Sequence, residues 1–120
     1  MMYRGEVVHG KGRGTRIGFP TLNFKIPDPF PYEHGIYAGW VSAGDRRYEA
    51  VFHYGPIPMF HESDPSLEAF LLDGVMLQKH SEISIEFIKK LREIKMFRTV
   101  HELTEQIGAD IQEAKKALNS

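Results

Sequence analysis

The sequence predicts a mainly β protein: an antiparallel barrel or sandwich followed by one C-terminal α-helix. Up to residue 87, short apolar and β-branched runs are separated by glycine and proline turns, with no helical pattern between them. Strands connected in this way favour antiparallel pairing in a barrel or sandwich. After residue 98, apolar residues recur instead at three- and four-residue steps. That spacing is typical of an amphipathic helix.

The expected strands are bounded by turn residues. Three prolines at alternate positions, Pro27, Pro29 and Pro31, end one strand-like run, because proline cannot donate to a sheet ladder. Gly44 and Asp45 mark a tight turn between two strong runs. The segments with strand character are residues 3–9, 24–26, 35–41, 48–54, 66–73 and 83–87.

A capping box marks the start of the helix. The side chain of Thr99 can accept a hydrogen bond from the third helical N–H, and Glu102 can return to the N–H of Thr99. Gly108 weakens the helix by about 1 kcal/mol relative to alanine without breaking it. We expect the apolar stripe to pack on the outside of the sheet. The stripe comprises Val100, Leu103, Ile107, Ile111, Ala114 and Leu118.

Composition excludes several classes of protein. The chain has 120 residues, 42% of them hydrophobic, which predicts one globular domain over residues 1–120. A net charge of −1 argues against a general nucleic-acid binder. The chain has no cysteine, no apolar run long enough to span a membrane and no signal-peptide core at its start. We therefore expect a cytoplasmic monomer with no nucleic-acid or membrane partner.

A glycine-rich, cationic stretch follows the first strand-like run. Glycines let backbone N–H groups turn toward an anion, and the cations add positive charge. The stretch lacks the Lys-Ser/Thr pair and the helix start of a P-loop, so a solvated turn remains an alternative. The candidate phosphate-binding residues are Gly10, Lys11, Gly12, Arg13, Gly14 and Thr15, followed by Arg16.

Three further side chains suggest metal-assisted phosphoryl transfer. Thr21 and Asn23 are two residues apart, so in an extended backbone they share one face and could bind one Mg²⁺ through oxygen. Glu68 is the one acid in the interior of a mostly apolar strand, where a carboxylate is costly unless it is paired or used. It is either a general base beside the glycine-rich loop or the partner of an arginine, with Arg13, Arg16 and Arg92 as candidates.

Taken in order, these segments resemble the riboflavin kinase (flavokinase) family, over nearly the whole chain. The most specific block is Gly12-Arg13-Gly14 with Gly18-Phe19-Pro20-Thr21-Leu22-Asn23. The resemblance continues through residues 35–39, through Gly55 and Pro58, and through Glu68 with residues 71–73. It ends with Leu91-Arg92 and residues of the helix: Phe97, Leu103, Gln106, Ile107, Asp110 and Ala114.

This resemblance implies a six-stranded antiparallel Greek-key barrel with a C-terminal helix. It also implies transfer of the γ-phosphate of ATP to the ribityl 5′-hydroxyl of riboflavin, giving FMN, with Mg²⁺ as cofactor. By position, Glu68 would be the general base, and Thr21 and Asn23 would hold Mg²⁺ and nucleotide. The loop from Gly10 would cover the nucleotide phosphates, and the segment around Arg92 and Phe97 would close on the flavin.

Two other functions remain open from the sequence. Residues 74–80 lack the Asp-x-Tyr-Gly segment usual in the family, which motivates a non-catalytic flavin- or nucleotide-binding module. His53 also stands where bacterial members often have asparagine. A nucleic-acid binder that uses Lys11, Arg13 and Arg16 is disfavoured by the balance of charge.

Overall fold

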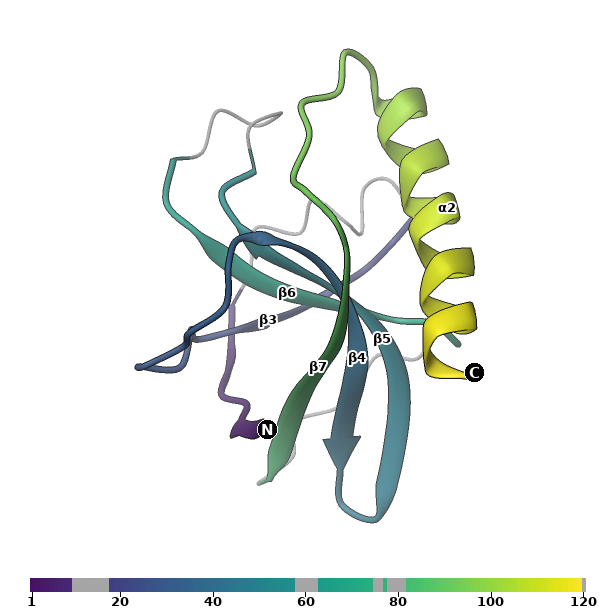
Figure 1. The fold of residues 1–120 in the computed structure, drawn as a ribbon. Helices are drawn as coiled ribbons and strands as arrows, with labels where there is room; N and C mark the ends of the chain where they lie inside the picture. Colours follow the sequence, from purple (N-terminus) through teal and green to yellow (C-terminus); the bar gives the residue numbers. More distant parts are fainter. Residues whose placement is uncertain (10–17, 58–62, 75–76, 78–81, 120) are drawn as a thin grey trace.

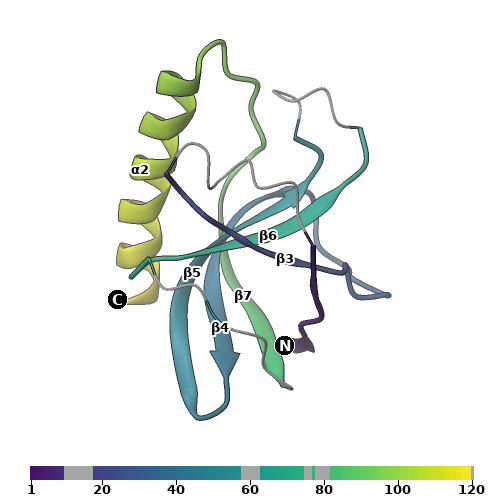
Figure 2. The same ribbon diagram turned by 180° about the vertical axis from the view of Figure 1, so that it is seen from behind.

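A single curled antiparallel sheet and one helix make up the fold (Figures 1 and 2). The structure is a computed structural model and describes residues 1–9, 18–57, 63–74, 77 and 82–119. The sheet order is β1-β7-β4-β5-β6-β3-β2. The elements are β1 (Met2–Arg4), β2 (Val7–Val8), β3 (Leu22–Phe24), β4 (Gly35–Ala43), β5 (Arg46–Gly55), β6 (Ser66–Leu71), β7 (Ile83–Arg92) and α2 (Val100–Leu118). The expected mainly β class with a C-terminal helix is confirmed.

The N-terminal segment joins the two edges of the sheet. β1 pairs with β7 at one edge, whereas β2, only three residues further on, pairs with β3 at the other. The residues between them continue both ladders: Gly5 N–H donates to Ile83 O at 2.7 Å, and Lys25 N–H donates to Glu6 O at 2.8 Å. A Cβ at Gly5 would lie 2.9 Å from the Phe24 ring, so glycine lets the segment pass close to the core.

This geometry corrects the strand count. We expected six strands with residues 3–9 forming the first, but that segment is divided into β1 and β2, giving seven. The division arises because one short stretch serves two different partner strands. β3 also differs from expectation: it begins at Leu22 and ends at Phe24 rather than covering residues 24–26.

The core fills the inside of the curled sheet. Alternate residues of the strands point inward, as the period of two requires. The fully buried side chains include Phe52, Leu67 and Ile85, each at most 1% exposed. The proline-rich connection adds aromatic rings to this core. Phe30 makes edge contacts with Tyr3, Tyr54 and Phe87, with ring centroids 4.9–5.3 Å apart.

The helix α2 packs on the outer face of the sheet, against β4, β5 and β7 (Figure 1). Ile36 and Ala38 are buried but lie outside the barrel core cluster, on the face of β4 that α2 covers. Thr99 caps the helix as expected, accepting from Glu102 N–H at 3.1 Å. The return bond differs: Glu102 accepts from the N–H of Arg98, at 3.4 Å, rather than from that of Thr99.

Three strands, β4, β5 and β7, are longer than expected. β7 continues to Arg92, five residues beyond Phe87, where the regular alternation of apolar residues ends. The alternation ends there because register shifts in the ladder with β4 interrupt the period of two. β4 and β5 extend to the turn at Gly44, whose φ of +62° suits glycine. Among the described residues, no helix is long and apolar enough to cross a membrane.

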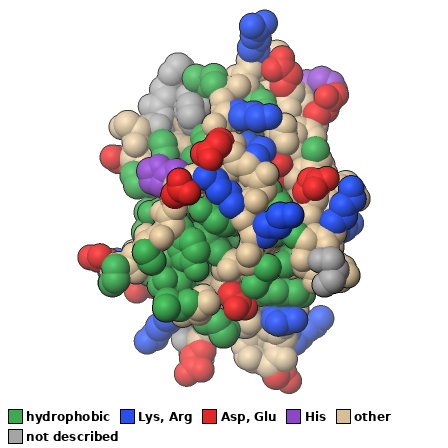
Figure 3. All heavy atoms as spheres, in the orientation of Figure 1, with side chains coloured by type: hydrophobic (Ala, Val, Ile, Leu, Met, Phe, Trp, Pro, Cys, Tyr) green, Lys and Arg blue, Asp and Glu red, His purple; other side chains and the backbone are tan. Residues whose placement is uncertain are grey.

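Figure 3 shows one face of the molecule, in the orientation of Figure 1. Cationic and anionic side chains are interspersed on this face, and hydrophobic side chains form a continuous area beside them. In the part of the chain that the structure describes, the exposed large hydrophobic residues are Met1, Met2, Val7, Val8, Ile88, Met96 and Val100.

Candidate active site

The candidate site starts from a contact between β6 and the residue that precedes β3. Thr21 Oγ1 donates a hydrogen bond to Glu68 Oε1 at 2.9 Å. Asn23 lies directly opposite Glu68 in the ladder between β3 and β6. Residues directly opposite each other in an antiparallel pair have Cβ atoms about 4.5–5.5 Å apart. A hydroxyl, an amide and a carboxylate therefore gather within one small area.

These side chains lie on the outer face of the sheet. Leu22 and Phe24 flank Asn23 in β3, and Leu67 and Ala69 flank Glu68 in β6; all four belong to the core. Because successive side chains alternate between faces, Asn23 and Glu68 point away from the core. The helix α2 lies on the same outer face, where it contacts β4, β5 and β7.

Strand register extends the site into a row of residues. The row crosses five strands: Asn23 on β3, Glu68 on β6, His53 on β5, Ile36 on β4 and Arg92 on β7. Neighbouring strands are about 4.8 Å apart, so about 14 Å separates Glu68 from Arg92 along the sheet. The row places the hydroxyl–carboxylate pair near one end and an arginine at the other.

Arg92 is held by the helix. Its Nε and Nη2 atoms donate to the two carboxylate oxygens of Asp110, both at 2.8 Å, and Gln106 donates to Asp110 Oδ1 at 3.0 Å. The side chains of Arg92 and Asp110 are only 15% and 6% exposed. Such a paired, two-pronged geometry is among the stronger charge-assisted contacts. The salt bridge between Glu68 and Arg92, one of the alternatives from the sequence, does not form.

Phe97 lies beside this arginine. The Arg92 Cζ is 5.9 Å from the centroid of the Phe97 ring, and Arg92 Nη1 also donates to Glu93 O at 2.9 Å. Arg92 thus connects β7, α2 and the segment between them. A direct contact of Arg92 or Phe97 with flavin stays a prediction.

His53 on β5 lies next to the candidate site. Its Nε2 lies 3.0 Å from Gly55 O and 3.1 Å from Pro56 O. Burial lowers the pKa of His53 below its usual value, and the negative charge of Glu68 opposes this shift. His53 is half-buried and lies opposite Glu68 in the ladder between β5 and β6. Alternation within β5 predicts its face, but its neighbour depends on the register with β6.

The donor set suits a hard cation. Because the hydroxyl hydrogen of Thr21 is directed at Glu68, the lone pairs of that oxygen stay free, and Asn23 offers an amide oxygen. Mg²⁺ takes oxygen ligands and is commonly bound through few protein groups together with substrate phosphates. Among the described residues, no group of three or more His, Asp or Glu side chains is placed to hold a metal ion.

Several predicted residues fall outside the described part of the chain. These are Gly10, Lys11, Gly12, Arg13, Gly14 and Thr15, together with Arg16. Their role at the nucleotide phosphates stays a prediction. Of the described residues that flank this stretch, His9 directly follows β2, and Gly18 precedes the start of β3 by four residues.

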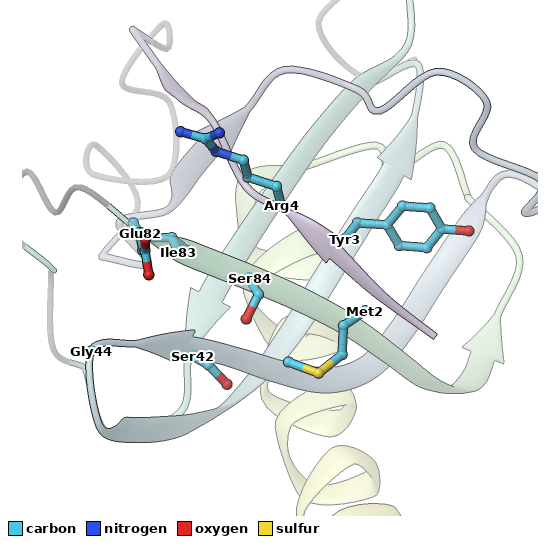
Figure 4. A pocket seen from close by; sticks show the side chains of 8 residues that line it. All are labelled: Met2, Tyr3, Arg4, Ser42, Gly44, Glu82, Ile83 and Ser84. Atoms are coloured by element: carbon cyan, nitrogen blue, oxygen red, sulfur yellow. The ribbon is translucent and has the colours of Figure 1, made fainter.

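A separate surface pocket lies away from these residues (Figure 4). Its volume is about 620 Å³. It lies between β1, the start of β7 and the end of β4, and the hydroxyls of Ser42 and Ser84 project from neighbouring strands. The lining residues are Met2, Tyr3, Arg4, Ser42, Gly44, Glu82, Ile83 and Ser84. None of them belongs to the row from Asn23 to Arg92.

Fold and site together define a class: a small antiparallel β-barrel with one C-terminal helix and a hydroxyl–amide–carboxylate site on its outer face. The riboflavin kinase family model matches residues 1–118. The chain is 34% identical to the riboflavin kinase of Homo sapiens over 122 residues, covering 96% of this chain and 79% of the human protein. The chain belongs to the riboflavin kinase family, as its sequence motifs predicted.

Two other relatives are longer than this chain. The bifunctional riboflavin kinase/FMN adenylyltransferase of Bacillus subtilis is 36% identical over 115 residues, covering 92% of this chain and 36% of that protein. A crystal structure described as a macrolide-efflux protein from Streptococcus pneumoniae has a TM-score of 0.81 at 25% identity. It covers 95% of this chain, and the match spans 38% of that structure. This likeness supports the fold.

Proposed function

We propose that this chain is an ATP-dependent riboflavin kinase, which transfers the γ-phosphate of ATP to the ribityl 5′-hydroxyl of riboflavin to give FMN and ADP. The observation that carries the proposal is the 2.9 Å hydrogen bond between Thr21 and Glu68, with Asn23 opposite Glu68 in the ladder. Membership of the riboflavin kinase family supports the choice of substrates.

Glu68 is the general base in this proposal. Its carboxylate accepts the proton of the ribityl hydroxyl as the hydroxyl oxygen bonds to the γ-phosphorus and the bond to the bridging oxygen of ADP breaks. Such transfers need little covalent chemistry from the protein and depend on positioning and charge. The hydrogen bond from Thr21 fixes one oxygen of Glu68, which leaves the other for the substrate.

Thr21 and Asn23 would hold Mg²⁺ with the nucleotide phosphates. The ion would neutralise charge on the phosphate oxygens. Residues 10–15 would lie over the same phosphates. Because the hydroxyl of Thr21 binds Glu68 and is also a candidate metal ligand, it would fix the distance between the base and the phosphate.

The row of residues suggests how the flavin would lie. The ribityl hydroxyl must reach Glu68, and the flavin ring would lie toward the segment of Arg92 and Phe97, above Ile36, which is buried in the middle of the row. An extended substrate with a reactive hydroxyl at one end and a planar ring at the other fits this direction. Phe97 would offer its ring to the flavin, and Arg92, held by Asp110, would keep the segment of Phe97 in place.

The experiment is incubation of the chain with riboflavin and MgATP, followed by chromatography for FMN. We expect FMN to form, EDTA to abolish its formation, and Glu68→Gln to reduce turnover by at least about 100-fold. Glu49→Gln is the matched control. Glu49 lies on the outer face of β5, as Glu68 does on β6, and its side chain accepts a hydrogen bond from Asn119. It should keep the turnover of the unmodified chain.

Absence of FMN from folded protein would reject the kinase. Quenching of riboflavin fluorescence without turnover would then favour a non-catalytic flavin-binding module. A cytoplasmic location, a monomeric state and the lack of nucleic-acid and membrane partners stay predictions, which sedimentation and cell fractionation can test.

A further inference from the structure

His53 and Thr21 flank the carboxylate of Glu68 from opposite sides. His53 faces Glu68 across the ladder between β5 and β6, and Thr21 reaches Glu68 from the side of β3. Side chains directly opposite each other on neighbouring strands are in contact range. The carboxylate therefore has a hydroxyl on one side and an imidazole on the other.

The imidazole of His53 is fixed to the backbone. Gly55 O and Pro56 O lie 3.0 Å and 3.1 Å from Nε2. Carbonyl oxygens only accept hydrogen bonds, so Nε2 carries a hydrogen and donates it to both. In the neutral ring the other nitrogen, Nδ1, is then unprotonated. Rotation of the ring would break both bonds, which ties the ring to the place where the chain leaves β5.

The surroundings keep this ring neutral. Burial, the largest influence, lowers the pKa of His53, and the charge of Arg92 on β7 adds to the effect. The negative charge of Glu68 on β6 and the bonds to Gly55 and Pro56 act in the opposite direction without overcoming burial. Among the described residues, Glu68 and Arg92 are the charged groups that act on this ring.

We infer that His53 is a positioning residue for Glu68: its ring, held by Gly55 and Pro56, packs beside the carboxylate and holds it against Thr21 without adding a positive charge. The inference rests on the proposed role of Glu68 as the base. A positively charged ring in the same place would attract the carboxylate and reduce its ability to accept a proton. The neutral ring restricts the carboxylate and leaves its charge available.

Steady-state kinetics with two substitutions tests the positioning role. His53→Leu removes the donor and the polar ring, and we expect it to lower kcat about 10-fold with KM for riboflavin and ATP nearly unchanged. His53→Asn can still donate to the carbonyl oxygens and cannot become charged in this pH range. We expect it to recover most of the turnover at pH 8 and to keep activity at lower pH than the unmodified chain.

A histidine far from the site provides the control. His101 is exposed on α2 and pairs with Glu105 at 2.7 Å, so His101→Gln should retain the unmodified pH profile and kcat. Folding of each variant is checked by circular dichroism. A folded His53→Leu variant with unchanged kcat and an unchanged pH profile would overturn the inference.

Nuclear magnetic resonance of the histidine nitrogens tests the same inference without turnover. We expect the Nε2–H form of His53 at pH 7.5, and a further decrease of its pKa in Glu68→Gln, because that change removes the charge that opposes the effect of burial. Glu49→Gln should leave the His53 titration unchanged. An Nδ1–H form, or equal titration in Glu68→Gln and the unmodified chain, would overturn the positioning role. If no FMN forms but the pKa of His53 still depends on Glu68, only the proposed kinase activity is rejected.

Discussion

The hydroxyl of Thr21 donates a hydrogen bond to a carboxylate oxygen of Glu68, 2.9 Å away and 47 positions further along the chain. The contact forms because β3 and β6 pair in a register that sets Asn23 opposite Glu68. It brings a candidate metal ligand and a candidate base together on the outer face of the barrel. The first prediction tests this contact.

Thr21 and Glu68 should act as a unit in turnover. Thr21→Val removes the hydroxyl, so it should lower kcat both by freeing the carboxylate and by removing a metal ligand. Glu68→Gln removes the base. We expect the double variant to lose less activity than the product of the two single losses, with a coupling of about 1–2 kcal/mol. Strictly multiplicative losses in a double-mutant cycle would show that the two residues act independently.

The pair of Arg92 and Asp110 should stabilise the docking of α2. Their side chains are 15% and 6% exposed, so removal of one charge leaves the other buried without its partner. We expect Asp110→Asn to lower the free energy of unfolding by about 3 kcal/mol in urea titrations. The exposed pair of Lys116 and Glu113, 3.5 Å apart, is the control, and Glu113→Gln should have no measurable effect. Equal effects of the two changes would contradict the importance of burial.

Two glycine-to-alanine changes should have opposite effects on stability. A Cβ at Gly39 would collide with the carbonyl oxygen of Glu86 and lie 2.9 Å from the Phe52 ring. We expect Gly39→Ala to cost at least about 2 kcal/mol. A Cβ at Gly108, within α2, would meet no atom within 4 Å outside the backbone of the helix and its two chain neighbours, so Gly108→Ala should stabilise the chain by about 1 kcal/mol. Thermal unfolding measures both, and a stabilised Gly39→Ala variant would show that β4 and β7 are not so closely packed.

Acid should destabilise the chain partly through His53. Burial lowers the pKa of this histidine in the folded state, whereas in the unfolded chain the value returns to about 6.5. Below that pH the unfolded state takes up the proton first, so stability is full above pH 6.5 and decreases as the pH falls toward the folded pKa. Urea titrations between pH 7.5 and 5 should show a smaller decrease in His53→Asn. Equal decreases in both proteins would contradict a lowered folded pKa.

The sequence by itself determined the local elements and the family. The capping residue Thr99 and the apolar stripe that follows it specify α2, because helix starts and faces depend on residues close together in the chain. Turn glycines and the alternation of apolar residues located β4, β5 and β6 to within a few residues. The order of the motifs predicted the riboflavin kinase family, which the comparisons confirm.

Only the tertiary structure decided which side chains meet. Strand pairing places His53 between Glu68 and Ile36. Arg92 forms its ion pair with Asp110 of α2 and not with Glu68. The N-terminal segment divides between two partner strands for the same reason. Register and edge pairing depend on the energies of contacts between distant segments, and a pattern of residues along one strand fixes its faces but not its neighbours.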